Sequence, residues 1–243
     1  MRLDKAIALT GMTRTEAKRA IAAGRVRVRR EVARDPGMQV TPEEVSIDGQ
    51  GIEGLREVYL MVNKPAGVVT ATEDRRLPCV ADLLPEKLRR RNPGPVGRLD
   101  RDVMGLVLMT TDGQLAHRLI APRWKAEKTY LARCEGRLTA EDAEAFRQGV
   151  TLSDFVARPA EMRIIEANDN ESVAETVLTE GKFHQVKRMF AAIGHPLIAL
   201  KRTQIGCVTL DEALAPGEWR ELTAAETEGL LRLCGLQEVE KHE

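Results

Sequence analysis

Residues 97–110 read Gly97-Arg98-Leu99-Asp100-Arg101-Asp102-Val103-Met104-Gly105-Leu106-Val107-Leu108-Met109-Thr110. The second half of this segment is a continuous apolar run, which predicts a buried strand over 105–109. The first half is a loop in which two carboxylates alternate with two arginines. Because nearby positive charge favours the ionised form of a carboxylate, this loop can present a nucleophile or a base. A surface loop of salt bridges has the same composition, so the pattern alone leaves both interpretations open.

The surrounding sequence predicts an α+β body from residue 58 onward. Strand-like runs fall at 58–62, 105–109, 129–133, 163–166 and 173–178, and helical patterns with start signals fall at 112–120, 139–148, 183–193 and 223–233. Strands outnumber helices, and many connections are as short as those of hairpins. We therefore expect a mostly antiparallel, mixed sheet rather than a doubly wound parallel one.

The first fifty residues predict a smaller, separate unit. Apolar residues recur at helical spacing over 3–9 and 17–22, and Thr13 and Glu16 have the spacing of a capping box. Residues 25–29 alternate arginine and valine, which places three guanidinium groups on one face of a strand. Glycines are frequent between residues 48 and 57. We therefore divide the chain into a head at 1–50, a linker at 51–57 and a body at 58–243.

The formal net charge is zero, but the charge is unevenly distributed. Residues 1–40 hold ten Lys or Arg against four Asp or Glu. A basic module of this kind indicates a polyanionic partner such as nucleic acid, because Lys and Arg neutralise phosphates and release counterions. A solvated charged face is the alternative interpretation.

Composition also excludes several classes of protein. No run of about 18 apolar residues is present for a membrane span, and residues 1–14 lack the apolar centre of a secretion signal, so a cytoplasmic protein is expected. The four cysteines are far apart, with no histidine at ligand spacing. Neither a metal site nor a disulfide framework is therefore expected.

Three further clusters hold residues that can carry chemistry. The first, Asn63-Lys64-Pro65-Ala66-Gly67, ends a strand and lacks the glycine spacing of a phosphate-binding loop. In the second, Lys128-Thr129-Tyr130-Leu131, strand alternation puts Lys128 and Tyr130 on one face. The third is a turn leading into a helix, Gly181-Lys182-Phe183-His184-Gln185-Val186-Lys187-Arg188-Met189-Phe190, whose apolar stripe leaves Lys187 and Arg188 at the flank. The alternatives are a half-buried core tyrosine and a solvated basic helix end.

Three short motifs of the head recur in a known module: Met1-Arg2-Leu3-Asp4-Lys5, the Thr-Arg-x-Glu-Ala step at 13–17, and Gly24-x-Val26-x-Val28. Together they resemble the S4 RNA-binding module of ribosomal proteins and RNA-modifying enzymes. In that module the helix pair and the following strand contact RNA. The resemblance therefore implies RNA contacts for the basic residues Arg2, Lys5, Arg14, Lys18, Arg19, Arg25 and Arg27.

Five motifs follow in order along the body: Asn-Lys-Pro-x-Gly at 63–67, Gly-Arg-Leu-Asp-x-Asp at 97–102, Glu-Lys-Thr-Tyr at 127–130, Gly-x-x-His-Gln-Val-Lys-Arg-Met at 181–189, and Pro-Gly-Glu-Trp-Arg at 216–220. In this order they resemble the pseudouridine synthases that modify bacterial ribosomal RNA. The start of the chain and the His-Gln-Val-Lys-Arg-Met-Phe-Ala-Ala segment look most like the group that acts on small-subunit RNA. Ribosomal RNA, or an assembling small subunit, is the partner that this resemblance implies.

The resemblance implies a catalytic role for three residues. Asp100 matches the family's aspartate, which attacks the target uridine so that the base detaches, rotates and rejoins the ribose through carbon 5. Lys187 matches the basic partner that keeps this carboxylate ionised, and Tyr130 matches the tyrosine that packs on the uracil and helps to remove its C5 proton. The nucleotide must be flipped out of the RNA helix to be reached. No metal and no organic cofactor is implied, since the reaction is an isomerisation.

Further RNA contacts are expected around this site. Arg98 matches the arginine that helps to hold the gap left in the RNA by the flipped nucleotide. Arg101, between the two aspartates, is expected to contact a phosphate, and Lys64 and Arg188 are expected to bind RNA as well.

One departure from the family pattern lies in the catalytic loop. The family usually has a threonine close after the second aspartate, where this chain has Val103-Met104, so a hydroxyl is absent next to Asp102. We expect activity to survive because Asp100, Tyr130 and Lys187 are present.

Three alternatives remain open at this point. The first is an RNA-binding ribosome assembly factor without turnover, and the second is a synthase for large-subunit RNA. The third is a glycosidase with Asp100 and Asp102 as paired carboxylates, which leaves the basic head unexplained. A monomer without membrane contact is expected in each case.

Overall fold

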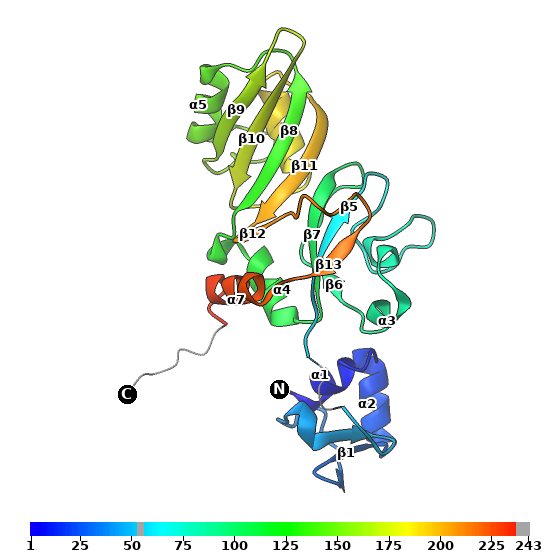
Figure 1. The fold of residues 1–243 in the computed structure, drawn as a ribbon. Helices are drawn as coiled ribbons and strands as arrows, with labels where there is room; N and C mark the ends of the chain where they lie inside the picture. Colours follow the sequence, from blue (N-terminus) through cyan, green and yellow to red (C-terminus); the bar gives the residue numbers. More distant parts are fainter. Residues whose placement is uncertain (53–55, 237–243) are drawn as a thin grey trace.

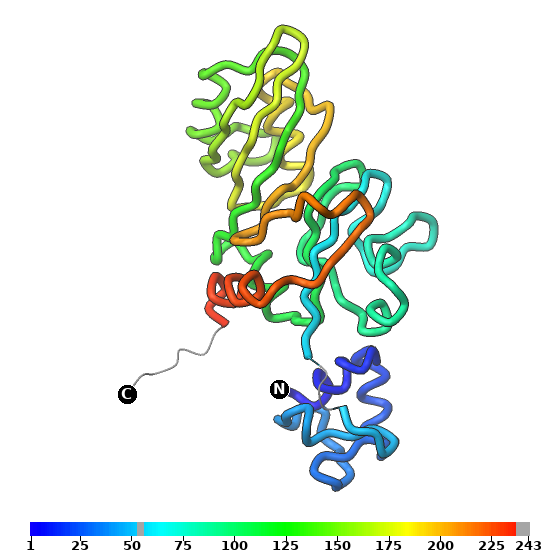
Figure 2. Tube along the Cα trace, in the orientation of Figure 1, coloured from blue at the N-terminus to red at the C-terminus, as the bar shows by residue number. Residues whose placement is uncertain are grey.

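The structure, a computed structural model, describes residues 1–52 and 56–236. A small head, blue in Figure 1, lies at one end of an elongated molecule, and the larger body extends away from it. The tube trace in Figure 2 shows the body built around strands from distant parts of the sequence. The head and the body each have a hydrophobic core of their own.

The head consists of two helices against a small antiparallel sheet. Helices α1 (Leu3–Ala8) and α2 (Arg14–Ala22) precede strands β1 (Val26–Val28), β2 (Glu31–Val32), β3 (Val45–Ile47) and β4 (Gln50–Gly51), with sheet order β2-β1-β3-β4. The 3-10 helix η1 (Pro42–Glu44) lies between β2 and β3. The capping box of α2 is present, with the Thr13 oxygen accepting from the Glu16 amide at 3.2 Å. Val26 and Val28 are buried and Arg27 is exposed between them, as predicted, but the strand is shorter than expected: Arg25 and Arg29 lie outside it, and Arg29 has a φ of +50°.

The head extends slightly further along the chain than the expected boundary at residue 50. Gly51 pairs with Ser46 in the head sheet, and the buried Ile52 belongs to the head core. The first two residues of the expected linker are thus part of the head, and linker residues 53–55 lie outside the described residues. The core of the body begins at Val58.

The body is built on a nine-stranded sheet. Its strands are β5 (Tyr59–Lys64), β6 (Gly94–Pro95), β7 (Met104–Thr110), β8 (Lys128–Glu135), β9 (Glu161–Ala167), β10 (Glu171–Leu178), β11 (Leu197–Ile205), β12 (Val208–Thr209) and β13 (Trp219–Glu221). The order is β13-β5-β7-β11-β8-β10-β9, with β6 on β7 and β12 on β11. Within this sheet β7 and β11 are parallel and the other pairs are antiparallel. The expected α+β fold with a mostly antiparallel, mixed sheet is confirmed.

Helices cover both faces of this sheet. They are α3 (Glu86–Arg89), α4 (Gly113–Ile120), α5 (Ala140–Gln148), α6 (Gln185–Ala192) and α7 (Ala224–Leu233), with short 3-10 helices η2 (Val80–Leu83) and η3 (Pro122–Trp124). Phe146 of α5 and Phe190 of α6 meet edge to face in the core on one side. Leu115 of α4 and Leu230 of α7 belong to the core on the other side. None of the helices in the described ranges is long and apolar enough to cross a membrane.

Strand β7 explains the apolar run quoted at the start. Val107 and Met109 point into the core of α5 and α6, whereas Leu106 and Leu108 point into the core of α4 and α7. A strand buried on both faces needs apolar residues at every position, which hides the usual alternation. The loop at 98–102 therefore enters a strand that is fixed from both sides.

Strand β11 is the central element that the sequence did not predict. It joins the two halves of the sheet, pairing with β7 on one side and β8 on the other. Lys201 and Arg202 interrupt its apolar pattern. Arg202 is nevertheless buried, and its Nε donates to the carbonyl of Leu106 at 2.9 Å. The strands also approach closely here, because a Cβ on Gly105 would lie 2.2 Å from the Arg202 carbonyl oxygen.

Candidate active site

The loop at 98–102 is held in place by hydrogen bonds on both sides of Asp100. The Thr70 hydroxyl donates to the Leu99 carbonyl at 2.8 Å and accepts from the Leu99 amide at 3.1 Å. On the other side, the Arg101 carbonyl accepts from the Gly67 amide at 2.8 Å. Sequence reasoning missed Thr70, because nothing in the local pattern shows that it meets a loop 29 residues away. The aspartate backbone is thereby pre-organised.

Lys64 has a different role from the one expected. Its side chain is fully buried, and its ammonium donates to the carbonyls of Pro65, Val68 and Arg101 at 2.9, 2.8 and 3.1 Å. An ammonium has three N–H donors, and all three are used. Burial lowers the pKa of Lys64 to about 8, against the opposing charges of Asp102 and Asp100. Lys64 has no exposed surface that could contact a phosphate, so the expected direct RNA contact is wrong. Its hydrogen bonds instead hold the loop at 98–102 in place.

Lys187, in the first turn of α6, lies between the two carboxylates of the loop. Its Nζ is 3.1 Å from Asp100 Oδ2, and it donates to Asp102 at 2.6 and 2.9 Å. Burial lowers the pKa of Lys187, but the hydrogen bonds to Asp102 and Asp100 outweigh it and raise the pKa overall. The Lys187 hydrogen bond likewise lowers the pKa of Asp102. The lysine is therefore cationic beside Asp100.

His184 also faces Asp100, and the sequence reasoning did not single it out. Its Nε2 lies 3.5 Å from Asp100 Oδ1, and it caps α6 in a left-handed conformation with φ of +49°. The amino end of a helix carries partial positive charge, which favours a carboxylate. Asp100 is thus approached by an ammonium, an imidazole and a helix end.

The turn before α6 is held by a buried side-chain network. Gln185 donates through Nε2 to Glu180 at 2.6 Å and accepts through Oε1 from the Lys182 amide at 2.9 Å. Glu180 also accepts from the Arg158 amide at 2.9 Å. These contacts fix the positions from which His184 and Lys187 reach Asp100.

Tyr130 and Asp100 line one small pocket of about 70 Å³. Tyr130 comes from β8 and is 7% exposed, next to Leu178 and Leu200 from the neighbouring strands. Val103 also lines this pocket and is buried, so the wall has a methyl surface where the family pattern has a hydroxyl. The structure thus brings Asp100, Tyr130 and Lys187 together from three distant segments.

The other expected RNA contacts of the body lie around this pocket. Arg98 is exposed and lines its mouth. Arg101 is exposed and its Nε donates to the Gly67 carbonyl at 3.2 Å. Arg188 is partly buried, with its guanidinium bound to Asp154 and Ser153. Two exposed arginines therefore flank the site, whereas Arg188 already has an acidic partner.

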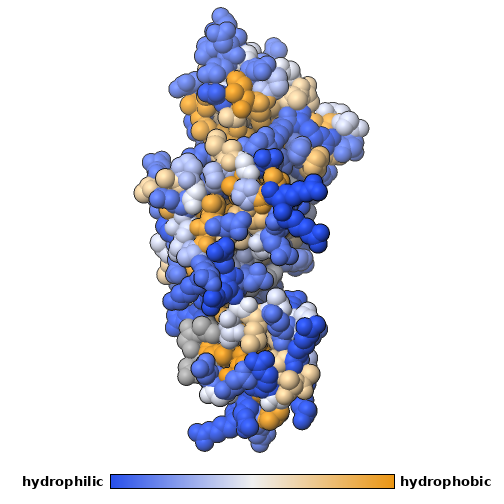
Figure 3. Space-filling model, turned by 90° about the vertical axis from the view of Figure 1, so that its right-hand side faces the viewer, coloured by the Kyte–Doolittle hydropathy of each residue, from blue (hydrophilic) through white to orange (hydrophobic). Residues whose placement is uncertain are grey.

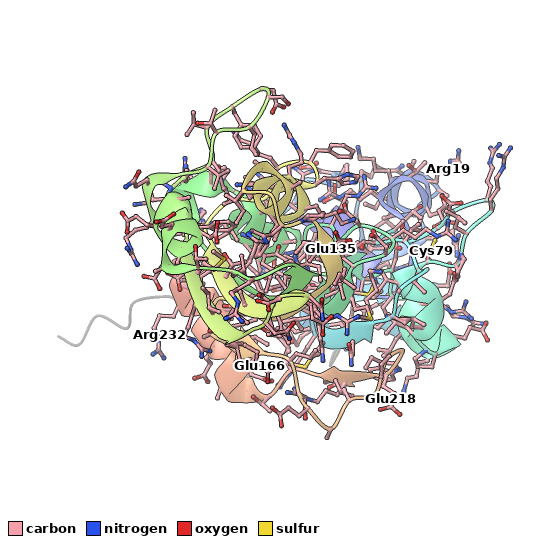
Figure 4. The ribbon with its side chains drawn as sticks, turned by 90° about the horizontal axis from the view of Figure 1, so that it is seen from above. Arg19, Cys79, Glu135, Glu166, Glu218 and Arg232 are labelled. Carbon is pink, nitrogen blue, oxygen red and sulfur yellow. The ribbon has the colours of Figure 1, made fainter. Side chains whose placement is uncertain are left out.

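The basic residues of the head fall into two groups. Arg14, Lys18, Arg19 and Arg27 are exposed and form no salt bridge among the described residues. Figure 4 shows Arg19 at the outer edge of the molecule, on the side of Cys79 and opposite Glu166 and Arg232. The others are paired: Arg2 with Asp4 at 3.0 Å, Arg25 with Asp48 at 2.5 Å, and Lys5 with Glu57 at 2.9 Å. Three of these four residues lie on α2, so its exposed face is a cationic surface of the head.

Comparison with known proteins agrees with this geometry. The family model for RNA pseudouridylate synthase matches residues 58–192, and the model for the S4 domain matches residues 1–46. A crystal structure of a pseudouridylate synthase superposes with a TM-score of 0.67 at 35% identity, covering 95% of this chain and 99% of that chain.

Curated relatives match over nearly their whole length. Ribosomal small subunit pseudouridine synthase A of Escherichia coli is 42% identical over 233 residues, covering 93% of this chain and 98% of that protein. An uncharacterised RNA pseudouridine synthase of Bacillus subtilis is 42% identical over 230 residues, covering 93% and 96%. These matches give no support to a glycosidase. The chain belongs to the RNA pseudouridylate synthase family and carries an S4 domain ahead of its catalytic body.

Proposed function

We propose that this chain isomerises a specific uridine of small-subunit ribosomal RNA to pseudouridine, with Asp100 as the nucleophile. The observation that carries the proposal is the salt bridge of 3.1 Å between Lys187 and Asp100, in the pocket that Tyr130 closes. A pure RNA-binding protein has no use for a carboxylate there, since a carboxylate repels phosphates. Lys187 offsets that repulsion by placing a positive charge beside Asp100.

The reaction exchanges one bond of the uridine for another. The N1–C1′ glycosidic bond breaks, the C5–C1′ bond forms, C5 loses a proton and N1 gains one, so atoms and electrons balance without a co-reactant. Asp100 acts as the nucleophile that allows the base to detach. Tyr130 packs on the uracil and takes part in removing the C5 proton. The uridine reaches this recessed pocket only as a flipped nucleotide.

The choice of small-subunit RNA rests on the relatives. The Escherichia coli and Yersinia pestis proteins of this similarity are both named for the small ribosomal subunit. The exposed face of α2, with Arg14, Lys18 and Arg19, gives the head a surface for the RNA backbone. The candidate catalytic residues come from one chain, so we propose a monomer acting in the cytoplasm, where ribosomal RNA is assembled.

The test is tritium release from small-subunit ribosomal RNA labelled at uridine C5. The wild type is expected to release tritium and Asp100→Asn to release none, because the substitution removes the charge and keeps the shape. Asp169→Asn is the matched control, since Asp169 is an exposed carboxylate that pairs with Arg137 on another part of the surface. Equal release by wild type and Asp100→Asn would overturn the assignment of the nucleophile.

The same assay separates the two alternatives that remain. Release from labelled large-subunit RNA but not from small-subunit RNA would replace the proposed substrate. Binding of both RNAs and of assembly intermediates without any release would leave the assembly-factor function instead.

A further inference from the structure

Phe183 is the one aromatic side chain that the fold presents to solvent. The chain has four Phe, two Tyr and two Trp, all within the described residues, and Phe183 alone is exposed, at 76%. Phe146 and Phe190 are fully buried, and the Phe155 ring is covered by Lys182 at 3.5 Å. Figure 3, which shows one side of the molecule, has mostly hydrophilic residues with apolar ones in separate patches. An open phenyl ring on such a surface is available for stacking by a flat group.

The ring is separated from Asp100 by one imidazole. Phe183 stacks on His184 with 3.8 Å between ring centroids and 17° between planes. The same imidazole lies 3.5 Å from Asp100. One face of the phenyl ring is therefore covered by His184, and the other is free to receive a flat group close to the mouth of the pocket.

The ring is also held on a fixed turn. Lys182, the residue before it, has its amide bound by the buried Gln185 side chain at 2.9 Å. Gln185 is in turn bound to the buried Glu180 at 2.6 Å. A pre-organised aromatic loses little conformational freedom on binding, which makes it an effective stacking surface.

Cations line the neighbouring pocket, which His184 also lines. Lys182 and Arg98 line the mouth of the pocket with exposed side chains, and Lys187 lies within it. A flat apolar face next to positive charge matches a nucleobase attached to its phosphates. Flipping of the target uridine also leaves the neighbouring base without one stacking partner.

We propose that Phe183 stacks on an unpaired base adjacent to the target uridine and so makes the flanking nucleotide part of substrate selection. The proposal rests on the function proposed above. Phe183 replaces the stacking that the neighbouring base loses, and the enzyme prefers a target in a loop, where that neighbour is free to turn onto the ring.

The first test separates binding from chemistry. Phe183→Leu keeps apolar bulk and removes the ring face, so we expect KM for the RNA to rise about tenfold with kcat unchanged. Phe183→Trp is expected to restore KM, since it restores a ring. The slope of affinity against salt should be unaffected by Phe183→Leu and should fall in Lys182→Ala. Ile165→Ala, an exposed apolar residue on β9, is the matched control.

The second test finds the base. The shortest small-subunit RNA fragment that is still modified is prepared with an abasic site at each position flanking the target. At one position the loss of the base and Phe183→Leu should be non-additive, each removing the same stack. Additive losses at every position, or a fall in kcat with unchanged KM, would overturn the inference while leaving the proposed function intact.

The stacking surface can be tested separately if the proposed function fails. If wild type modifies no RNA, the fluorescence of Phe183→Trp, corrected for Trp124 and Trp219, is titrated with a ten-nucleotide uridine oligomer. Quenching supports the stacking surface without the reaction, and an unchanged spectrum overturns it.

Discussion

At the scale of single residues, Lys187 serves two carboxylates at once. Asp100 lies inside the pocket, whereas the Asp102 side chain is 74% exposed at its mouth. An exposed negative charge at the entrance repels the phosphates of an approaching RNA. Asp102 therefore competes with Asp100 for Lys187 and opposes binding.

Replacing Asp102 separates these effects. Asp102→Asn should tighten the Kd for RNA about two- to fivefold at low salt, with little change in kcat, because Lys187 keeps its contact with Asp100. The effect should shrink as salt is raised. Filter-binding and tritium-release assays at two salt concentrations measure both quantities. A tenfold or greater loss of kcat would show instead that Asp102 takes part in the reaction.

Lys64 is buried and holds the loop at 98–102 through hydrogen bonds. Lys64→Met removes three hydrogen bonds to the carbonyls of Pro65, Val68 and Arg101. Leaving buried acceptors without this partner should lower the free energy of unfolding by about 2 kcal/mol and reduce kcat by loosening the loop. Urea unfolding and the tritium assay check both effects, with the exposed Lys87→Met as control. A variant as stable and active as wild type would contradict this role.

At the scale of secondary-structure elements, a charged pair joins α7 to the sheet. Arg220 of β13 donates to both carboxylate oxygens of Glu226 at 2.8 Å. The Arg220 hydrogen bond lowers the pKa of Glu226 from 4.5 to about 2. The capping box that Thr223 forms with Glu226 also lowers the pKa of Glu226. Glu226 therefore stabilises both the start of α7 and the attachment of α7 to the sheet.

This pair predicts part of the acid sensitivity of the body. A carboxylate with a depressed folded-state pKa stabilises the protein above its unfolded pKa, and that contribution is lost as pH falls towards the folded value. For Glu226 the loss should amount to about 3 kcal/mol between pH 4.5 and 2. Glu226→Gln should be less stable at pH 7 and less sensitive over that window, by urea unfolding at several pH values. The exposed Glu166→Gln serves as control, and parallel curves for wild type and Glu226→Gln would refute the assignment.

At the scale of the whole molecule, the head is docked on the body at two points. Lys5 pairs with Glu57 at 2.9 Å and lies 3.7 Å from Asp112 at the start of α4. Gly11 approaches the end of α3, where an added Cβ would lie 1.8 Å from the Arg90 carbonyl oxygen. A cavity of about 1180 Å³ between the head and α3 is lined by Arg19, Arg25 and other basic residues of both units. The docked position of the head therefore determines how one RNA can contact the head and the body at the same time.

Gly11→Ala tests this docking. The clash with Arg90 should move the head away from the body, which increases the radius of gyration in small-angle scattering and raises KM for RNA. Gly49→Ala is the matched control, because Gly49 also has a positive φ, +84°, but nothing lies within 4 Å of an added Cβ. Both variants carry similar backbone strain, so only Gly11→Ala should change the scattering. Unchanged scattering for both would exclude a fixed docked head.

The sequence alone determined the local elements and the chemistry-bearing motifs. Periodicity and capping residues predicted α2, α4, α5 and α7, since a helix or strand forms from neighbours along the chain. The resemblance pointed to Asp100, Tyr130 and Lys187, and the structure places them in one region, although their roles stay a prediction.

Only the tertiary structure decided which distant residues meet. The place of β11 depends on pairing with β7 and β8, and the burial of Lys64 depends on a loop 37 residues away. The role of His184 could not be predicted, because only the fold brings the start of α6 to Asp100, with Phe183 stacked on the imidazole. Short-range sequence patterns do not predict such contacts. The contacts depend on how a sheet buried on both faces packs, and not on local propensity.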